Sequence, residues 1–207
     1  MDDRHEFRQP DLAELVGSRL CHDLVNPLSA IANGIELLTL SGAARTPEVE
    51  LIADAVGDAM ARIRFFRVAF GAARAGETLS ERDMRDSLSA LYAGTRLALD
   101  WQVAGELPRR EAKLGFLLLS CAETALPLGG ALTVQRAGGG WRIHGAGRKL
   151  SVDDDLWSLA QGGSLSAPPA SRIQFALLAE ALQGDARRLR LDWDPPGAGL
   201  DLVLAAP

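Results

Sequence analysis

Two long segments near the start of the chain carry apolar side chains at helical spacing, and this pattern constrains the fold more than any other feature. In residues 11–40 the apolar positions recur every three or four residues, which predicts a helix that ends at Ser41. Thr46 and Pro47 are typical of a helix cap and a first turn, so a second helix is expected to begin there. Its apolar positions follow an unbroken heptad up to Gly71, which is typical of a coiled-coil seam. The two apolar rows are Leu20, Leu24, Leu28, Ile31, Ile35 and Leu38 in the first helix and Val49, Ile52, Val56, Ala59, Ile63, Phe66 and Phe70 in the second.

These two helices are expected to form an antiparallel hairpin, because only a short loop joins them. A hairpin on its own cannot bury its apolar seam. Pairing with a second copy would close a four-helix bundle, and we therefore expect a homodimer. The alternative is that the C-terminal half of the chain covers the seam.

The size and composition of the chain favour a folded protein. Its 207 residues include 47% hydrophobic and 24% charged side chains, close to the average for globular proteins. The net charge of −5 argues against a nucleic-acid partner, because binding a phosphate backbone needs a basic face. Cys21 and Cys121 stand alone and predict buried free thiols rather than disulfides or a zinc site. The polar N-terminal residues and the absence of a long apolar stretch predict a cytoplasmic protein that does not cross a membrane.

The face of the first helix opposite the apolar row is polar. On a helical wheel His22, Asn26, Ser29 and Asn33 form one stripe there. A neutral exposed imidazole is a nucleophile, and a neighbouring carboxylate such as Asp23 can orient and deprotonate one ring nitrogen while the other attacks. The stripe therefore predicts phosphoryl transfer through His22, with Asp23 and Asn26 as its catalytic companions. The alternative is an ordinary solvated face.

The residues around His22 resemble a known signalling motif. The stretch Ser18-Arg19-Leu20-Cys21-His22-Asp23-Leu24-Val25-Asn26-Pro27-Leu28 is similar to the H-box of histidine kinases, in which an acid follows the phosphate-accepting histidine. Together with Asn33-Gly34-Ile35-Glu36-Leu37-Leu38 and the arginine- and phenylalanine-rich residues 62–72, it resembles the ChpT family of histidine phosphotransferases. The resemblance is strong over residues 11–75 and weaker beyond them. It implies a dimeric phosphotransfer bundle fused to a degenerate kinase-like α/β domain, which passes phosphoryl groups between the receiver domains of a phosphorelay.

The pattern changes after Gly76, which predicts a helical hairpin in residues 1–76 and a second domain in residues 77–207. Ser80 is expected to cap a helix that runs to about Ala93. The patterns that follow predict an α+β arrangement with a sheet on one side and helices on the other. The remaining expected helices are 108–126, 152–161 and 170–183, and the expected strands are 96–101, 131–136, 141–144, 187–193 and 199–205.

The second domain resembles the ATP-binding domain of histidine kinases in its order of elements, but the residues that would hold a nucleotide are missing. Residues 117–126 lack the Mg²⁺-binding asparagine of that domain, and Glu123 is the only candidate oxygen ligand nearby. Ile143 stands where the adenine-binding aspartate is expected, and Pro168-Pro169-Ala170-Ser171-Arg172 replaces a glycine-rich phosphate loop. We interpret Gly145-Ala146-Gly147 as a turn. No cofactor is therefore expected on this chain, and Mg²⁺ is expected on the partner receiver domain.

Several polar residues near the stripe are candidates for contact with a partner. Arg19 precedes the predicted acceptor by one turn and could assist charge or docking, and Ser29 belongs to the stripe itself. Arg62, Arg64 and Arg67 on the second helix either form a solvated face or meet the acidic phosphorylation pocket of a receiver. Of these, Arg19, Ser29, Arg62 and Arg67 are the predicted partner-binding residues.

The sequence thus predicts a homodimeric histidine phosphotransferase without autokinase activity. Its expected partners are response-regulator receiver domains and the receiver domain of a hybrid histidine kinase, with no role for nucleic acid or a membrane. One alternative is a sensor-type kinase that phosphorylates itself with ATP. The other is a non-catalytic dimeric scaffold or antikinase.

Overall fold

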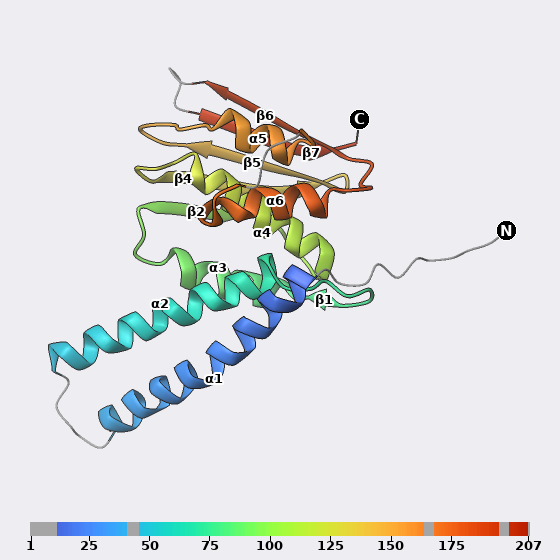
Figure 1. Cartoon of the computed structure of the whole chain (residues 1–207). Coiled ribbons are helices and arrows are strands. Elements are labelled where there is room, and N and C mark those ends of the chain that lie inside the picture. Colours follow the sequence, from blue (N-terminus) through green and yellow to red (C-terminus); the bar gives the residue numbers. More distant parts are fainter. Residues whose placement is uncertain (1–11, 41–45, 164–167, 195–198, 207) are drawn as a thin grey trace.

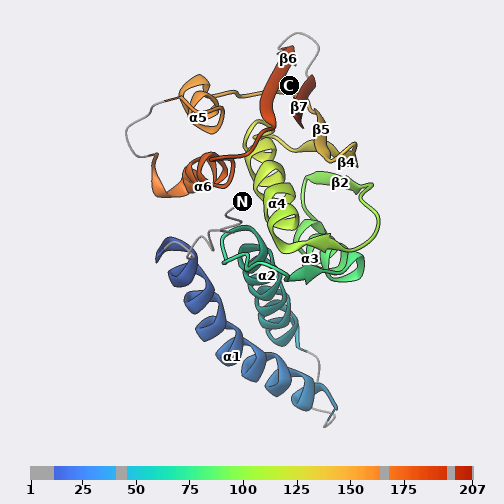
Figure 2. The same cartoon turned by 90° about the vertical axis from the view of Figure 1, so that its right-hand side faces the viewer.

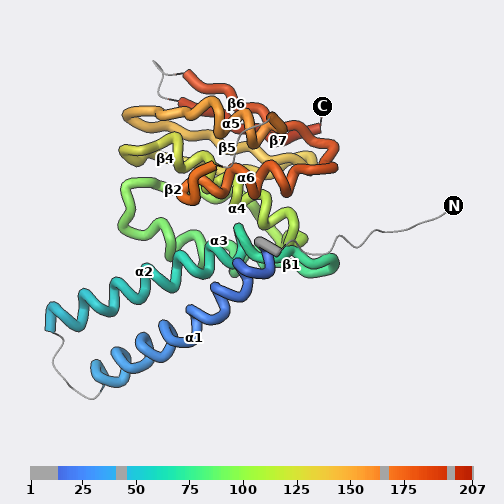
Figure 3. The backbone as a smooth tube through the Cα atoms, viewed as in Figure 1, coloured from blue at the N-terminus to red at the C-terminus, as the bar shows by residue number. Residues whose placement is uncertain are grey.

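The structure is a computed structural model that describes residues 12–40, 46–163, 168–194 and 199–206. The backbone runs from a helical hairpin near the N-terminus into a sheet-containing part that ends the chain (Figure 3). Among the helices in these ranges, none is both long and apolar enough to cross a membrane.

The N-terminal part of the chain forms the helical hairpin that its apolar rows predict. Helix α1 spans Leu12–Leu40 and α2 spans Pro47–Ala69, and the two lie side by side and project away from the rest of the molecule (Figure 1). The Thr46 hydroxyl accepts a hydrogen bond of 3.4 Å from the Val49 amide, which caps α2. Both predicted helices and the predicted cap are confirmed, and α1 continues through Pro27.

The remainder of the chain forms a two-layer α+β domain. Its elements are β1 (Thr78–Leu79), α3 (Glu81–Tyr92), β2 (Leu97–Trp101), β3 (Leu107–Pro108), α4 (Arg109–Thr124), β4 (Gly130–Ala137), β5 (Gly140–Ala146), α5 (Asp154–Ala160), the 3₁₀ turn η1 (Ala170–Arg172), α6 (Ile173–Ala181), β6 (Arg188–Asp194) and β7 (Gly199–Ala205). The main sheet has the order β2-β4-β5-β7-β6, and only its β2–β4 pair is parallel. Figure 2 shows the sheet on the right, α5 and α6 on the left and α4 between them. The predicted α+β class is confirmed.

Every helix and strand expected from the sequence has a counterpart in the structure, with shifted ends. The expected helix over 170–183 is divided into η1 and the shorter α6. Strands β1 and β3 were not predicted, because two residues are too few to show a period. Pro108 belongs to β3, so α4 begins one residue later than expected.

The expectation of a turn at Gly145-Ala146-Gly147 is wrong, because Gly145 and Ala146 continue strand β5. Gly145 pairs with Leu132 on β4 and with Leu200 on β7. A Cβ atom on Gly145 would lie 2.9 Å from Leu200 and 3.0 Å from Leu132. The glycine therefore serves packing inside the sheet, which a glycine-rich sequence alone does not distinguish from a turn.

Gly115 on α4 occupies another crowded position. A Cβ atom there would lie 2.4 Å from the Trp141 ring on β5. We expect Gly115→Ala to lower the free energy of unfolding by about 1–3 kcal/mol, because the buried indole has no room to move. Gly34→Ala is the matched control, since a Cβ atom at that position on α1 would meet no other part of the structure within 4 Å and alanine favours helix. Urea denaturation of both variants measures the difference, and equal stabilities would contradict the packing account.

The last turns of α2 belong to the core of the α+β domain. Phe65, Val68 and Ala69 are buried in one cluster with residues of α4 and the sheet. The Phe65 ring stacks on Phe116 of α4 with centroids 5.1 Å apart. The C-terminal half of the chain therefore covers this face of α2.

Much of the apolar row of the hairpin remains exposed in the single chain, although Val56 and Ile63 of that row are buried. Leu20 and Leu24 are 58% and 50% exposed, and Ile31 and Ile52 are 47% and 50% exposed. The C-terminal half of the chain covers the end of the row on α2, where Phe70 packs against its core, but it leaves these four side chains exposed. An apolar row of this extent on a helical hairpin is typical of a surface that another helix covers.

A buried lysine connects the hairpin to the α+β domain through an ion pair and a hydrogen bond. Lys113 on α4 is 4% exposed and forms an ion pair with Glu14 on α1. It also donates a 3.1 Å hydrogen bond to the carbonyl oxygen of Gly71, just beyond α2. Ser18 on α1 accepts a further bond of 3.1 Å from the Ala72 amide. We call the contacts of Lys113 with Glu14 and Gly71 the lysine joint.

Candidate functional site

His22 lies on the exposed face of α1, as the polar stripe predicts. Its side chain is 71% exposed, whereas the preceding Cys21 is 7% exposed. Burial raises the pKa of the Cys21 thiol, and the positive charge of Arg67 on α2 partly opposes this shift. The turn of α1 that presents His22 to solvent therefore lies near Arg67.

Asp23 connects His22 to Arg19 through its two carboxylate oxygens. Oδ1 lies 3.1 Å from Nδ1 of His22, and Oδ2 accepts a 2.7 Å hydrogen bond from Nε of Arg19. The hydrogen bond with His22 and then the bond with Arg19 hold the pKa of the Asp23 carboxyl below its usual range. An ionised Asp23 accepts the proton that Nδ1 carries, which assigns the tautomer and leaves the lone pair of Nε2 directed to solvent.

The other predicted site residues lie further from the imidazole. Asn26 is exposed one turn beyond His22 and Ser29 is half-buried, and within the described residues neither side chain is hydrogen-bonded to the histidine. Arg62 is exposed on α2. The carbonyl oxygen of Arg67 accepts a hydrogen bond from the Arg109 guanidinium of the α+β domain. The structure thus gathers Arg19, His22 and Asp23 and places Arg67 nearby.

The residues of the α+β domain that stand where histidine kinases bind ATP make contacts within the protein instead. Ile143 is fully buried in the sheet. Glu123, near the end of α4, accepts a 3.1 Å hydrogen bond from the Tyr92 hydroxyl. Burial and then the charge of Glu123 raise the pKa of Tyr92. Glu123, the one candidate ligand for Mg²⁺ in this region, is therefore hydrogen-bonded to Tyr92 of the neighbouring helix α3.

The chain is similar to known proteins over most of its length. Residues 81–197 match the family model described as the histidine phosphotransferase C-terminal domain. The protein phosphotransferase ChpT of Brucella abortus (strain 2308) is 34% identical over 164 residues, which cover 76% of this chain and 78% of that protein. The chain belongs to the ChpT family of histidine phosphotransferases.

A solved structure shows the same fold as this ChpT-family chain. The structure titled "1.7 Angstrom Structure of a Bacterial Phosphotransferase" superimposes with a TM-score of 0.64 at 24% identity, over 90% of this chain and 92% of that one. Membership of the ChpT family makes the chain a phosphotransferase. The resemblance stated from the residues around His22 is confirmed at the level of the family.

Two features of this ChpT-family protein were not found from the sequence. The bond between Arg19 and Asp23 follows the one-turn spacing of opposite charges on a helix, which was a usable signal. The lysine joint had a weaker signal, since Lys113 is the only charged residue in the stretch from Ala112 to Leu119. Its partner Glu14 is too distant in sequence for any local pattern to identify.

Proposed function

We propose that this chain relays phosphoryl groups between receiver-domain aspartates, with His22 as the intermediate acceptor. The observation that carries the proposal is the exposed His22 imidazole, whose Nδ1 lies 3.1 Å from the ionised carboxylate of Asp23. Membership of the ChpT family supports the reaction type. The donor is a receiver domain that carries an aspartyl phosphate, such as that of a hybrid histidine kinase, and the acceptors are receiver domains of response regulators.

In the first half-reaction the Nε2 lone pair of His22 attacks the phosphorus atom of the aspartyl phosphate. The new N–P bond forms as the P–O bond to the aspartate breaks, and the aspartate leaves as a carboxylate. The imidazole ring then carries a positive charge with its proton on Nδ1. Asp23 stabilises this charge, and transfer to the next receiver reverses the same steps.

The neighbours of His22 have distinct roles in this proposal. A carboxylate with a lowered pKa is a weak base, so Asp23 orients the imidazole and stabilises its charge rather than removing its proton. Arg19 holds Asp23 in position through the 2.7 Å bond. Asn26, one turn away, favours phosphoryl attack over attack by water. Ser29, Arg62 and Arg67 contact the receiver, where their polar and basic side chains suit an acidic phosphorylation pocket.

The α+β domain does not bind ATP in this proposal. The missing asparagine and the buried Ile143 support that view, because a nucleotide site needs polar contacts to Mg²⁺ and adenine. The Mg²⁺ ion that assists phosphoryl transfer belongs to the receiver domain. Residues 1–76 then supply dimerisation and phosphotransfer, and residues 77–207 form the kinase-like domain, against which the last turns of α2 pack. The two free cysteines fit a reducing cytoplasm.

The experiment that tests this function follows radiolabelled phosphate. A receiver domain that carries labelled aspartyl phosphate should transfer the label to this chain, in a form that acid releases and alkali preserves, as expected for phosphohistidine. Labelled ATP with Mg²⁺ should leave the chain unlabelled. Labelling by ATP would favour the sensor-kinase alternative. Stable receiver binding without any transfer would favour the scaffold.

We also propose that two copies of the hairpin form a four-helix bundle. The exposure of Leu20, Leu24, Ile31 and Ile52 supports this arrangement, because a second copy of the same row would bury them.

The dimer is tested by placing a charge on the open row. Ile31→Glu should shift the protein from dimer to monomer. Burying an unpaired carboxylate in an apolar interface weakens association by roughly several kcal/mol. Asn33→Glu adds the same charge at an exposed position on the predicted polar stripe and should remain dimeric. Light scattering after size-exclusion chromatography measures the mass of each variant. A dimer that withstands Ile31→Glu would place the interface elsewhere.

A further inference from the structure

A cavity of about 450 Å³ lies at the end of α4, on the α+β domain. It opens between α4, the start of α6 and the start of β2, and it contains none of the predicted phosphotransfer residues. Its size falls within the range of small-molecule sites in proteins. Its lining is Thr95, Arg96, Leu97, Ser120, Glu123, Thr124, Leu126, Pro127, Gly129, Arg172 and Gln174.

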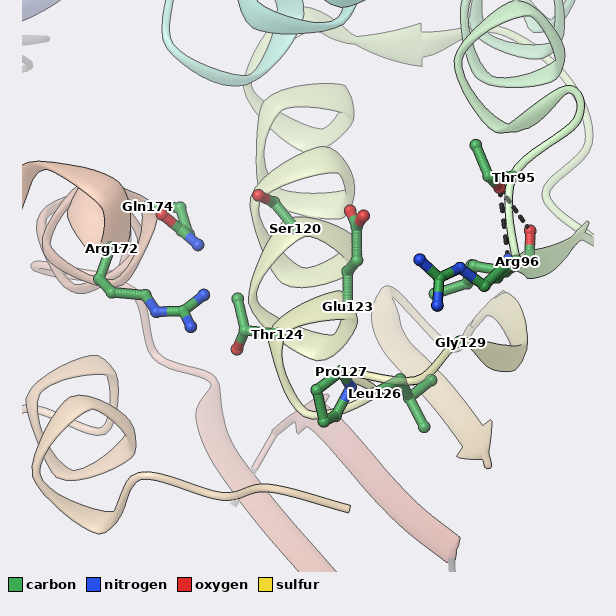
Figure 4. Close-up of a pocket in the computed structure, with 11 residues that line it drawn as sticks. Thr95, Arg96, Ser120, Glu123, Thr124, Leu126, Pro127, Gly129, Arg172 and Gln174 are labelled. Atoms are coloured by element: carbon green, nitrogen blue, oxygen red, sulfur yellow. Dashed lines mark hydrogen bonds between the residues drawn. The ribbon is translucent and has the colours of Figure 1, made fainter. Parts of the chain in front are cut away.

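Two side chains from the α6 side of this cavity are directed toward α4. Figure 4 shows the Arg172 guanidinium and the Gln174 amide pointing toward Ser120 and Thr124. Gln174 is only 7% exposed, yet within the described part of the chain its amide forms no hydrogen bond. The amide atoms of Gln174 are not fully buried, so they reach the solvent of the cavity, where a bound ligand can take the place of water as their hydrogen-bond partner.

The polar groups of this wall are mainly donors. A guanidinium has five N–H donors and no acceptor, and the Gln174 amide can present its NH₂ group. Ser120 has a hydroxyl without a hydrogen-bond partner among the described residues, whereas the Thr124 hydroxyl already donates to the Cys121 carbonyl at 2.7 Å. Converging donors around a positive charge suit an oxyanion.

The start of α6 also favours an anion in the cavity. Arg172 is the N-cap residue of α6, and Gln174 belongs to its first turn. The amino end of a helix carries a partial positive charge that attracts anions. The one carboxylate in the lining, Glu123, lies on the Arg96 side of the cavity, away from Arg172, and accepts a hydrogen bond from the Tyr92 hydroxyl (Figure 4).

We propose that this cavity binds the phosphate or carboxylate group of a small anionic ligand, held by Arg172, Gln174 and Ser120. The site is independent of phosphotransfer through His22. Binding gives the Gln174 amide a hydrogen-bond partner and neutralises the charge of Arg172.

The test is isothermal titration of the full chain with inorganic phosphate, with succinate and with ADP, each up to about 10 mM. Saturable binding of phosphate or of succinate is expected, and the ligand that binds identifies the group. Arg172→Gln should weaken that binding about tenfold or more, since hydrogen bonds to charged groups are strong. Arg96→Gln removes the same charge beside Glu123 and should change the affinity less than twofold.

Other outcomes overturn the proposal. The proposal fails if neither phosphate nor succinate binds saturably, or if ADP alone binds. It also fails if Arg96→Gln and Arg172→Gln weaken anion binding equally. Gln174→Leu provides a second variant if Arg172→Gln does not fold, and it should also weaken binding. His22→Ala should bind the anion normally. This result separates the cavity from the proposed relay, because each can fail without the other.

Discussion

We expect the His22→Ala variant to take up no label from a phosphorylated receiver domain, whereas the unmodified chain is labelled within the same incubation. The alanine removes the only nitrogen nucleophile of the proposed site, and no other group there can form the N–P bond. Autoradiography of the separated proteins measures the result, and circular dichroism confirms that the variant is folded.

His144 provides a matched control for this experiment. Its Nδ1 lies 3.1 Å from Oδ1 of Asp201, and the two side chains are 54% and 51% exposed. It therefore repeats the histidine–carboxylate pair of α1 on the open face of the sheet, away from the predicted receiver surface. His144→Ala should accept label at the normal rate. Loss of labelling in His144→Ala, or retention of it in His22→Ala, would reject the assignment.

Asp23→Asn completes the series with a partial effect. The amide keeps the shape of the carboxylate but lacks its charge, so the imidazole is held less well and its positive charge is not balanced. The rate of phosphoryl uptake should fall about tenfold to a hundredfold. A normal rate of phosphoryl uptake would mean that the receiver domain alone orients the His22 imidazole.

The second large effect concerns stability. We expect Lys113→Met to lower the free energy of unfolding by about 3 kcal/mol, because Glu14 then loses its ionic partner and the Gly71 carbonyl loses a donor. For a chain of this length the melting temperature should fall by about 6–12 °C. Differential scanning calorimetry measures the shift.

Lys149 serves as the control for the lysine joint, because it is the only other lysine in the chain and is exposed. Lys149→Met should change stability by less than about 0.5 kcal/mol. Glu14→Gln and the double variant complete a mutant cycle that isolates the coupling between the two side chains. If Lys113→Met were as stable as Lys149→Met, the joint would not hold the hairpin to the domain.

Much of the secondary structure was predictable because its signals are local. The apolar rows of α1 and α2 repeat with the helical period, and Thr46 marks the start of α2 with a cap that the structure contains. His22, Asp23 and Arg19 lie within one turn and a half of one helix, so their proximity follows from helix geometry. The sequence could therefore identify this group before the fold was known.

Other features depend on packing between distant segments. Gly145 belongs to a strand because it pairs with β4 and β7, and Leu132 and Leu200 occupy the space that a side chain would need there. The short strands β1 and β3 exist only as partners of each other. No local period distinguishes these cases from a turn or a loop.

By itself the sequence determined the helices, the apolar row and the polar stripe with His22, because each depends on the spacing of neighbouring residues. Only the tertiary structure decided which face of α2 the α+β domain covers and how Lys113 reaches Glu14. It also decided that Arg172 and Gln174 share a cavity with Ser120. These contacts join residues far apart along the chain, where hydrophobic burial and the need to satisfy buried polar groups select the partners.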